Sequence, residues 1–231
     1  MRNIDEVCFF MKTSFCFAIL LCIFPFFVSQ FAMADRLRPG AVGYSVIEGK
    51  QYRVLSEKVE GVPNVLEFFS FYCQHCYQFE QEFHLSAQVQ DGLPKGVNVV
   101  KYHVSSMGPL GADLTRAWAV AGLLGVEDKI EPALFDAIQN KRTVHTTGDI
   151  RRVFTESGIR GEDYDLAWTS FAVNSMVVRQ EKAMSDFRVK GVPVMYVRGQ
   201  YQIIPQGMDA DSLEVFMSHY AETVRYLAGK K

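Results

Sequence analysis

The chain has 231 residues, of which 48% are hydrophobic and 22% are charged, a composition typical of a globular protein and not of a disordered or fibrous one. Its 24 lysine and arginine residues nearly balance its 26 aspartate and glutamate residues, which leaves a formal net charge of -2. A chain without a basic field has no electrostatic means of holding a polyanion, so we expect no nucleic-acid partner.

The N-terminal segment has the pattern of an export signal. Residues 15–28 (FCFAILLCIFPFFV) form an uncharged apolar run, with Lys12 before it and the small-x-small triplet AMA after it, at residues 32–34. The run is shorter than the about 20 residues that a membrane-spanning helix needs. The pattern predicts a secretory signal peptide over residues 1–34, cleaved after Ala34, with an uncleaved membrane anchor as the alternative.

Cleavage at this point would leave a single pair of cysteines. The chain has five cysteines, but only Cys73 and Cys76 follow the predicted signal. Disulfides form and persist in the oxidising environments that receive exported proteins. We therefore expect these two cysteines to form a disulfide with each other.

The segment after the signal begins with an α/β pattern. We expect a loose arm over residues 35–50 and a first strand over Tyr52–Leu55. The aromatic-rich run Asn64–Phe71 (NVLEFFSF) lies between a proline and the cysteine pair, which predicts a buried strand. A helix is expected from Cys73 to about Gln90, followed by a second central strand over Val97–Val104. The apolar face of this helix would be formed by Cys76, Phe79, Phe83 and Ala87.

Between Ser106 and about Gln180 the pattern changes to helices alone. Four or five helix-length segments with apolar faces are separated by glycines, which predicts a small all-helical unit inserted into the α/β part. A long helix through Met176–Arg188 would return the chain to the sheet. The chain would then end in a hairpin, Val194–Val197 with Tyr201–Ile204, and an amphipathic helix over Asp211–Leu227.

The sequence Cys73-Gln74-His75-Cys76 carries the candidate chemistry. A C-x-x-C motif directly after a buried strand, in the first turn of a helix, is typical of thiol–disulfide chemistry. Unpaired N–H groups and the partial positive charge at the helix N-terminus would stabilise a thiolate on Cys73 and lower its pKa. A protonated His75 would add to this stabilisation. Cys76, one turn further along, would be the more shielded partner.

Three other interpretations of the cysteine pair fit the sequence less well. A structural disulfide closing so short a loop would stabilise the fold by only about 2 kcal/mol. A zinc site needs four ligands, and the segment after residue 34 has no second cysteine pair and no closely spaced pair of histidines. A reduced and inert pair would be at odds with export to an oxidising compartment.

Two charged residues interrupt the apolar strands. Glu67 lies in VLEFF and Lys101 in VVKYH. Each could face solvent on an open side of the sheet. If the two strands are neighbours, however, the side chains could pair beneath the cysteines, and a buried carboxylate there could exchange a proton with Cys76.

Five segments follow one another along the chain: VLEFFSFYCQHCYQFE, KYHV, LTRAWAVA, GVP and PQGM. In this order and at these separations they resemble the DsbA family of bacterial periplasmic thiol:disulfide oxidoreductases, over most of the chain from Gly49 to Lys231. The resemblance implies an α/β thioredoxin fold with an inserted all-helical domain. The first part of the thioredoxin-like domain would span residues 35–105, the inserted domain 106–180 and the second part 181–231.

The resemblance implies roles for the residues of the motif. Cys73 corresponds to the cysteine that bonds to substrate, Cys76 to its partner, and His75 to the residue that stabilises the Cys73 thiolate and makes the disulfide strongly oxidising. The family usually has proline where this chain has Gln74. Because proline fixes φ and lacks an N–H, we expect Gln74 to shift the redox potential, as in a specialised paralogue.

The resemblance also implies supporting residues. Glu67 and Lys101 resemble a buried charged pair under the site, and Glu80 a further acidic neighbour. Val192 and Pro193 resemble a cis-proline loop beside the disulfide, where an extended substrate could pair with the backbone.

The activity implied is donation of the Cys73–Cys76 disulfide to reduced, unfolded secreted proteins in the periplasm. A membrane quinone reductase of the DsbB type would reoxidise the protein, which would act as a monomer and use its own disulfide in place of a metal or other cofactor. Two alternatives stay open. The protein could be a disulfide isomerase or reductase, or a periplasmic chaperone that binds peptides on an apolar surface around Phe71, Met107 and Pro193.

Overall fold

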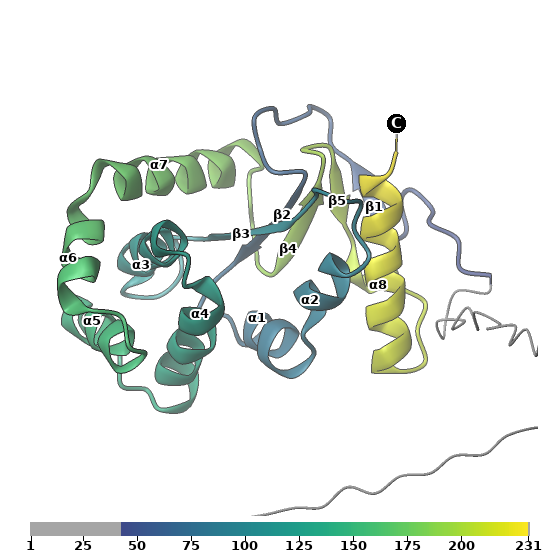
Figure 1. The fold of residues 1–231 in the computed structure, drawn as a ribbon. Coiled ribbons are helices and arrows are strands. Elements are labelled where there is room, and N and C mark those ends of the chain that lie inside the picture. Colours follow the sequence, from purple (N-terminus) through teal and green to yellow (C-terminus); the bar gives the residue numbers. More distant parts are fainter. Residues whose placement is uncertain (1–42, 231) are drawn as a thin grey trace, which may run out of the picture. The chain divides into compact units, whose positions relative to one another are not determined.

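The computed structural model describes residues 43–230, which build a five-stranded sheet in the strand order β1–β5–β4–β2–β3 (Figure 1). β2 and β3 run parallel, and the other neighbouring pairs are antiparallel. The strands are β1 (Tyr52–Val54), β2 (Val65–Phe69), β3 (Val99–His103), β4 (Val194–Val197) and β5 (Tyr201–Ile203). All five were predicted. The predicted signal peptide, residues 1–34, lies outside the described residues.

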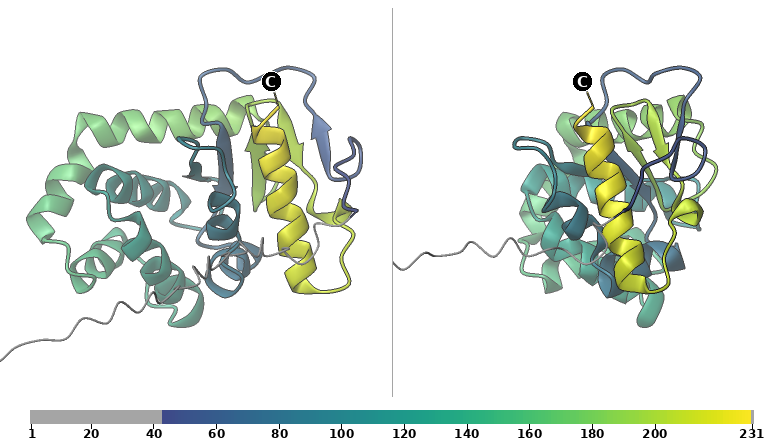
Figure 2. Two further views of the ribbon diagram at one scale, coloured as in Figure 1. Left: turned by 45° about the vertical axis from the view of Figure 1, so that its right-hand side comes forward. Right: turned by 90° about the vertical axis from the view of Figure 1, so that its right-hand side faces the viewer.

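β2 lies inside the sheet and is buried along its whole length. Side chains alternate between the faces of a strand, so each face of β2 needs its own cover. Val65 packs in a core with α2 (Leu85–Gln90) and with α8 (Leu213–Ala228), which runs along the sheet in Figure 2. Leu66 and Phe68 pack on the opposite face. The alternation places Glu67 on the face that α2 covers.

The prediction of one helix over Cys73–Gln90 is wrong, because the helix breaks near its middle. The structure forms α1 (Gln74–Tyr77), a π-helical turn η1 (Gln78–Glu82) and then the separate helix α2. Between η1 and α2, His84 has a left-handed backbone with φ 52°, a conformation that a right-handed helix cannot include. The break changes which positions face the core, and Ala87, predicted to be buried, is exposed. The buried positions of α2 are Leu85, Ser86 and Val89.

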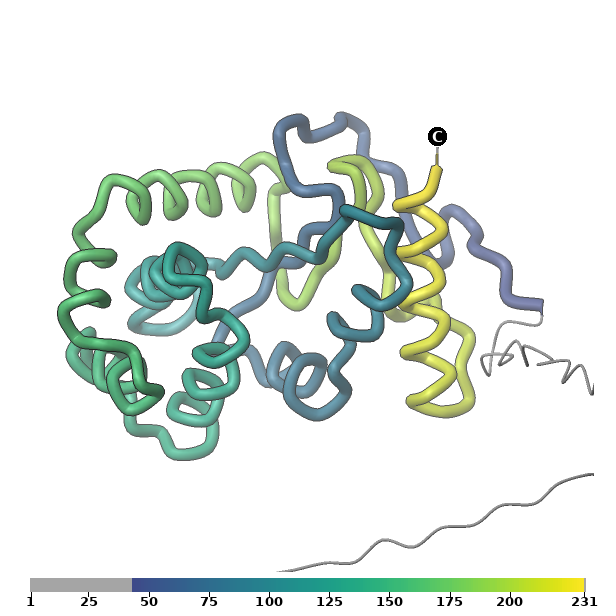
Figure 3. The backbone as a smooth tube through the Cα atoms, viewed as in Figure 1, coloured from purple at the N-terminus to yellow at the C-terminus, as the bar shows by residue number. Residues whose placement is uncertain are grey.

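Helices alone connect β3 to β4, as predicted. Figure 3 shows the chain leaving β3, winding through these helices and returning along α7. They are α3 (Gly111–Leu124), α4 (Glu127–Phe135) with the π-helical turn η2 (Asp136–Asn140), α5 (Thr147–Glu156), α6 (Gly161–Thr169) and α7 (Phe171–Asp186). They share a core of apolar side chains that also contains both cysteines. The predicted domain boundary at residue 180 falls inside α7, so the division into domains stays a prediction.

The C-terminal part follows the expected order. After the β4–β5 hairpin come a short 3₁₀ turn η3 (Pro205–Gly207) and α8, which begins at Leu213 behind the N-cap Ser212. Ser212 accepts a hydrogen bond from the N–H of Val215, as is usual for a serine in this position. Within residues 43–230, no helix combines the length and the hydropathy that crossing a bilayer requires.

Candidate active site

Cys73 stands at the point where the chain leaves β2 and enters α1. It is the N-cap residue of α1, with φ -90° and ψ 115°, and its sulfur accepts a hydrogen bond from the N–H of Cys76 at 3.2 Å. Both cysteines are free thiols in this structure. The Cys73 thiol donates to the carbonyl oxygen of Val192 at 3.3 Å. The sulfur of Cys73 therefore lies between a helix N-terminus and the loop before β4.

The two cysteines have opposite electrostatic environments. The hydrogen bond from the Cys76 thiol, together with the backbone N–H groups of Cys76 and His75, lowers the pKa of Cys73 to about 7 against the effect of burial. Burial raises the pKa of Cys76 well above its ordinary value, and the hydrogen bond to Cys73 and the nearby charge of Glu67 act in the same direction. At neutral pH a large share of Cys73 is therefore a thiolate, whereas Cys76 stays a thiol.

The loop before β4 has the geometry that the family resemblance implies. The Val192–Pro193 peptide bond is cis. Both residues are partly exposed, and the Val192 carbonyl contacts the Cys73 sulfur. The structure thus brings this loop and the C-x-x-C motif together, while a role in binding substrate stays a prediction.

Two polar side chains that the sequence did not single out hold the loop between β2 and α1. Gln139 of η2 donates from its Nε2 to the carbonyl oxygens of Phe71 at 2.9 Å and Cys73 at 3.0 Å. His103, at the end of β3, accepts a hydrogen bond from the N–H of Phe71 on its Nε2 at 3.2 Å. Its Nδ1 lies 2.9 Å from the hydroxyl of Thr115. The helical segment and β3 therefore both position the residues that lead into Cys73.

His103 acts in this network as a neutral group. Burial lowers its pKa to about 3, so it carries no charge at neutral pH. Because Nε2 accepts from Phe71, the single proton of the neutral ring lies on Nδ1, which donates to Thr115. This arrangement satisfies a buried backbone N–H without placing a cation beside the cysteines.

Phe71 itself corrects an expectation. It was predicted to form part of an exposed apolar surface, but it is 0% exposed and packs against the His103 ring with a centroid distance of 5.2 Å. Met107 is 36% exposed and Pro193 is partly exposed. The apolar surface on which the chaperone alternative depends therefore lacks its central aromatic residue.

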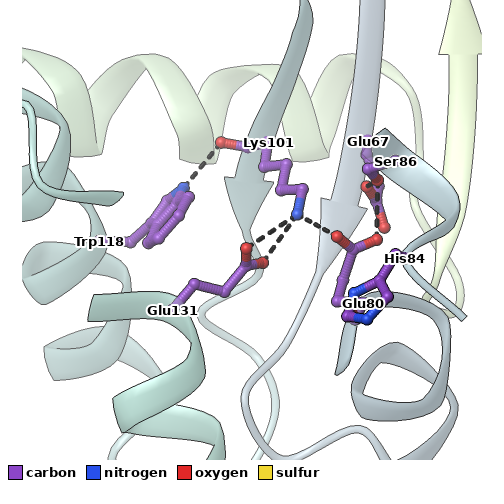
Figure 4. Close-up of polar contacts among 7 residues, drawn as sticks. All are labelled: Glu67, Glu80, His84, Ser86, Lys101, Trp118 and Glu131. Carbon is purple, nitrogen blue, oxygen red and sulfur yellow. Dashed lines mark hydrogen bonds and ion pairs between the residues drawn. The ribbon is translucent and has the colours of Figure 1, made fainter. Parts of the chain in front are cut away.

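Glu67 and Lys101 are neighbours in the sheet but do not form the predicted pair. They lie opposite each other in the register of β2 and β3. Neither faces open solvent, since Glu67 is 3% exposed and the side chain of Lys101 is 14% exposed. Among the described residues, Lys101 forms its ion pairs with Glu80 and Glu131 instead, as Figure 4 shows. The Lys101 ammonium group is thus paired with one carboxylate from η1 and one from α4.

Glu67 is held by a hydroxyl group. Ser86 of α2 lies with its Oγ 2.7 Å from Glu67 Oε2 and 2.7 Å from Glu80 Oε1 (Figure 4). Burial raises the pKa of Glu67 to about 8, and the charge of Glu80 adds to this increase while that of Lys101 opposes it. Glu67 is therefore mainly protonated at neutral pH, close enough to Cys76 for its charge to affect that thiol.

The remaining predicted residues lie on the outer side of the motif. Gln74 and His75 are both exposed at the start of α1. The backbone N–H of His75 contributes to the low pKa of Cys73, whereas the effect of a protonated His75 side chain stays a prediction. Within residues 43–230, no group of three or more His, Cys, Asp or Glu side chains is arranged to hold a metal ion.

The residues that sequence reasoning missed are Ser86, Glu131, Gln139 and His103. Ser86 and Glu131 lie on predicted helices, where a serine or a glutamate is most often a solvated residue. The spacing of neither residue indicates that it meets a strand far away in the sequence. Only His103, in the middle of the KYHV motif of a buried strand, carried a signal, because a buried histidine requires a partner.

Comparison with known proteins agrees with this geometry. Residues 64–221 match the DSBA-like thioredoxin domain family. The thiol:disulfide interchange protein DsbA of Salmonella typhi is 56% identical over 186 residues, which cover 80% of this chain and 90% of that protein.

Two solved structures are also similar. One is a cysteine-to-serine variant of Proteus mirabilis DsbA with a non-covalently bound peptide; it has a TM-score of 0.79 and 44% identity and covers 81% of this chain and 100% of its own. The other is SrgA of Salmonella enterica serovar Typhimurium, with a TM-score of 0.75, 42% identity and coverage of 78% and 100%. The implied fold is confirmed, and the chain belongs to the DsbA-like thioredoxin family, as a thiol:disulfide oxidoreductase.

Proposed function

We propose that this protein donates the disulfide between Cys73 and Cys76 to newly exported proteins in the periplasm. The observation that carries the proposal is the contrast between the two sulfurs. Cys73, at the N-cap of α1, has hydrogen-bond donors and a pKa of about 7, whereas Cys76 is fully buried with a raised pKa. In such a pair only the Cys73 sulfur forms a bond with the substrate, because Cys76 is out of its reach.

The reaction would start from the oxidised protein. A thiolate of the substrate attacks Cys73 Sγ, the Cys73–Cys76 bond breaks, and Cys76 leaves and takes up a proton. A second thiolate of the substrate then attacks the substrate sulfur of this mixed disulfide and displaces Cys73. The substrate loses two electrons and gains a disulfide, and the protein is left with a Cys73 thiolate and a Cys76 thiol. Because a low pKa makes Cys73 a good leaving group, the second step favours release.

Glu67 is the proposed proton donor to Cys76. It is mainly protonated at neutral pH because burial raises its pKa to about 8, and in its ionised form its charge raises the pKa of Cys76. Supplying a proton to the departing Cys76 sulfur would prevent a buried thiolate, which is costly in an apolar core. The buried carboxyl group is thus assigned to the first step of the reaction.

The loop at Val192 and Pro193 is the proposed site for the substrate backbone. The Val192 carbonyl group lies next to the Cys73 sulfur. The loop comes directly before β4, a position that suits strand-like pairing with an extended chain. The Proteus mirabilis relative with a bound peptide supports the assignment of peptide binding to this chain. We propose a broad preference for unfolded chains, since backbone pairing does not select side chains.

The predicted signal peptide would place the protein in the periplasm, and an outside oxidant must then restore the disulfide. We assign this role to a membrane quinone reductase of the DsbB type. The protein would work as a monomer with its disulfide as the redox centre and without a metal or another cofactor.

The equilibrium constant of the Cys73–Cys76 couple against glutathione tests the proposal. We expect a strongly oxidising value in the purified protein, and stoichiometric oxidation of a reduced, unfolded substrate that is lost in Cys73→Ser. A strongly reducing value would rule out the oxidase in favour of a reductase. Substrate binding that persists in Cys73→Ser without any oxidation in the wild type would instead favour a chaperone.

A further inference from the structure

Lys101 is shared by two carboxylates that come from different parts of the chain. Its Nζ contacts Glu80 of η1 and lies 2.9 Å from each carboxylate oxygen of Glu131 of α4. The side chains are 14% exposed for Lys101, 6% for Glu80 and 13% for Glu131. Charge interactions between groups with so little solvent around them are stronger than those on an open surface.

The geometry around Ser86 requires an additional proton in this cluster. Its Oγ lies 2.7 Å from an oxygen of Glu67 and 2.7 Å from an oxygen of Glu80. A hydroxyl has one proton and can donate to only one of the two carboxylates. The other short contact needs a proton of its own, so one of the two acids is a neutral carboxyl group that donates to Ser86.

The charges explain where this proton comes from. Three acids, Glu67, Glu80 and Glu131, surround the single ammonium group of Lys101. With all three ionised, the cluster would hold a net charge of about -2 in a largely buried place, which is unfavourable. Because Glu131 binds Lys101 through both oxygens, less of the positive charge is left to stabilise ionised Glu67 and Glu80.

Other titratable groups face this cluster from the elements around it. Cys76 of α1 and Tyr220 of α8 both feel the charge of Glu67, and Asp128 of α4 acts on Glu131. His84 and Asp128 line an open groove of about 550 Å³ together with Glu80, Lys101 and Glu131. Within the described part of the chain, none of these neighbours is a cation that pairs with Glu67.

We propose that Glu131 is a positioning residue for the disulfide reaction: by holding Lys101, it keeps a proton on the Glu67–Ser86–Glu80 chain at neutral pH. This inference rests on the proposed function only in so far as that proton is the one given to Cys76. A residue of the helical segment thereby sets the pH range in which the buried acids beneath the cysteines carry a proton that they can donate.

The test is a titration of the glutamate carboxyl carbons by NMR in the purified, oxidised protein, in which neither cysteine titrates. We expect one buried carboxyl to titrate near pH 8 in the wild type. In Glu131→Gln, the loss of one negative charge should lower its proton affinity by about tenfold or more, a shift of about one pH unit or more. The matched control is Glu127→Gln, which removes an acid from the same helix, where it lines a separate pocket together with Lys101 and Glu131.

The outcomes separate this inference from the proposed function. An unchanged midpoint in Glu131→Gln, an equal shift in Glu127→Gln, or the absence of any carboxyl titrating above the ordinary range would overturn it. Glu131→Asp keeps the charge and should leave the midpoint near that of the wild type, even if Glu131→Gln folds poorly. These results do not depend on oxidase activity. The rate of thiolate attack on the disulfide should fall when the buried acid loses its proton, and this fall should begin at a lower pH in Glu131→Gln than in the wild type. Below about pH 6, the equilibrium constant of the Cys73–Cys76 couple against glutathione should be the same in both proteins.

Discussion

The active-site region has an outer end at Cys73, where the pKa of the thiol is lowered, and an inner end at Glu67, where the pKa of the carboxyl group is raised. At the outer end, the Cys73 sulfur accepts from the Cys76 thiol and from N–H groups at the start of α1, and its pKa falls to about 7. At the inner end, burial and the charge of Glu80 leave Glu67 with a pKa of about 8, far above the ordinary value for a carboxyl group.

The contrast shows that burial alone does not decide ionisation. Cys73 and Glu67 are both hidden from solvent, at 5% and 3% exposed, although Glu67 lies deeper in the protein. They also differ in their partners: the Cys76 thiol and backbone N–H groups donate to the sulfur, whereas the carboxyl shares one hydroxyl with a second acid. Several hydrogen-bond donors stabilise the ionised form of Cys73 and make it a leaving group, whereas Glu67 has too few donors to stay ionised and can give up a proton.

Removing the inner cysteine should produce the largest effect. In Cys76→Ser, no internal thiol can displace a partner from Cys73, so we expect a stable mixed disulfide with glutathione or with a substrate peptide. Cys73→Ser should form almost none, because its remaining thiol is buried and has a raised pKa. Intact mass under non-reducing conditions measures the adduct, and a reductant should remove it. Equal yields of the mixed disulfide in the two variants would show that the two cysteines do not differ in reactivity.

Neutralising the inner acid should change stability in a pH-dependent way. The pKa of Glu67 rises from 4.5 in the unfolded chain to about 8 in the folded one, so the folded state binds a proton that the unfolded state has released. Wild-type stability should therefore fall as the pH rises from about 4.5 to 8, by at most about 1.4 kcal/mol per pH unit. Glu67→Gln should lack this loss and be more stable than the wild type above about pH 8, by a few kcal/mol.

Urea unfolding of the oxidised protein over this pH range measures the difference. The matched control is Glu57→Gln, which removes an exposed acid and should keep the wild-type slope. Parallel stability curves for the wild type and Glu67→Gln would show that Glu67 is ionised in the folded protein. The inner acid would then be unable to supply the proposed proton.

The smallest effect is expected at the outer end, from Gln74→Pro. The backbone donors that lower the pKa of Cys73 belong to His75 and Cys76, so proline at Gln74 removes neither of them. Its fixed φ should hold the start of α1 more firmly and make the disulfide more oxidising, by a few-fold in the glutathione equilibrium constant. Gln74→Ala keeps the N–H and should match the wild type. Identical constants for all three proteins would refute a tuning role for this position.

The parts of the molecule with local signals were predictable from the sequence. The strands have short apolar runs bounded by turns, and the hairpin of β4 and β5 is close in sequence, so the sheet was expected nearly to the residue. The C-x-x-C motif at a strand-to-helix junction likewise pointed to Cys73. The break at His84 was missed because the residues before and after it continue an apolar helical spacing.

The inner acid cluster could not be predicted in the same way. Sequence placed Glu67 and Lys101 on two strands, and predicted either that each faces solvent or, if the strands are neighbours, that the two side chains pair. The contacts that replace it join Lys101 to Glu131, 30 positions along the chain, and Glu67 to Ser86, 19 positions along. Such contacts depend on how α4 and α2 pack on the sheet, and no local pattern records that packing.

The bridge formed by Gln139 has a consequence for engineering a smaller oxidant. A single amide group of the helical segment satisfies the carbonyl oxygens of both Phe71 and Cys73. Deleting the helices and joining β3 to β4 directly would leave two acceptors next to the reactive sulfur without this donor, and unmet buried acceptors cost about 1–3 kcal/mol each. A minimised scaffold would therefore need a new side chain that reaches the same two oxygens before its motif could keep the geometry seen here.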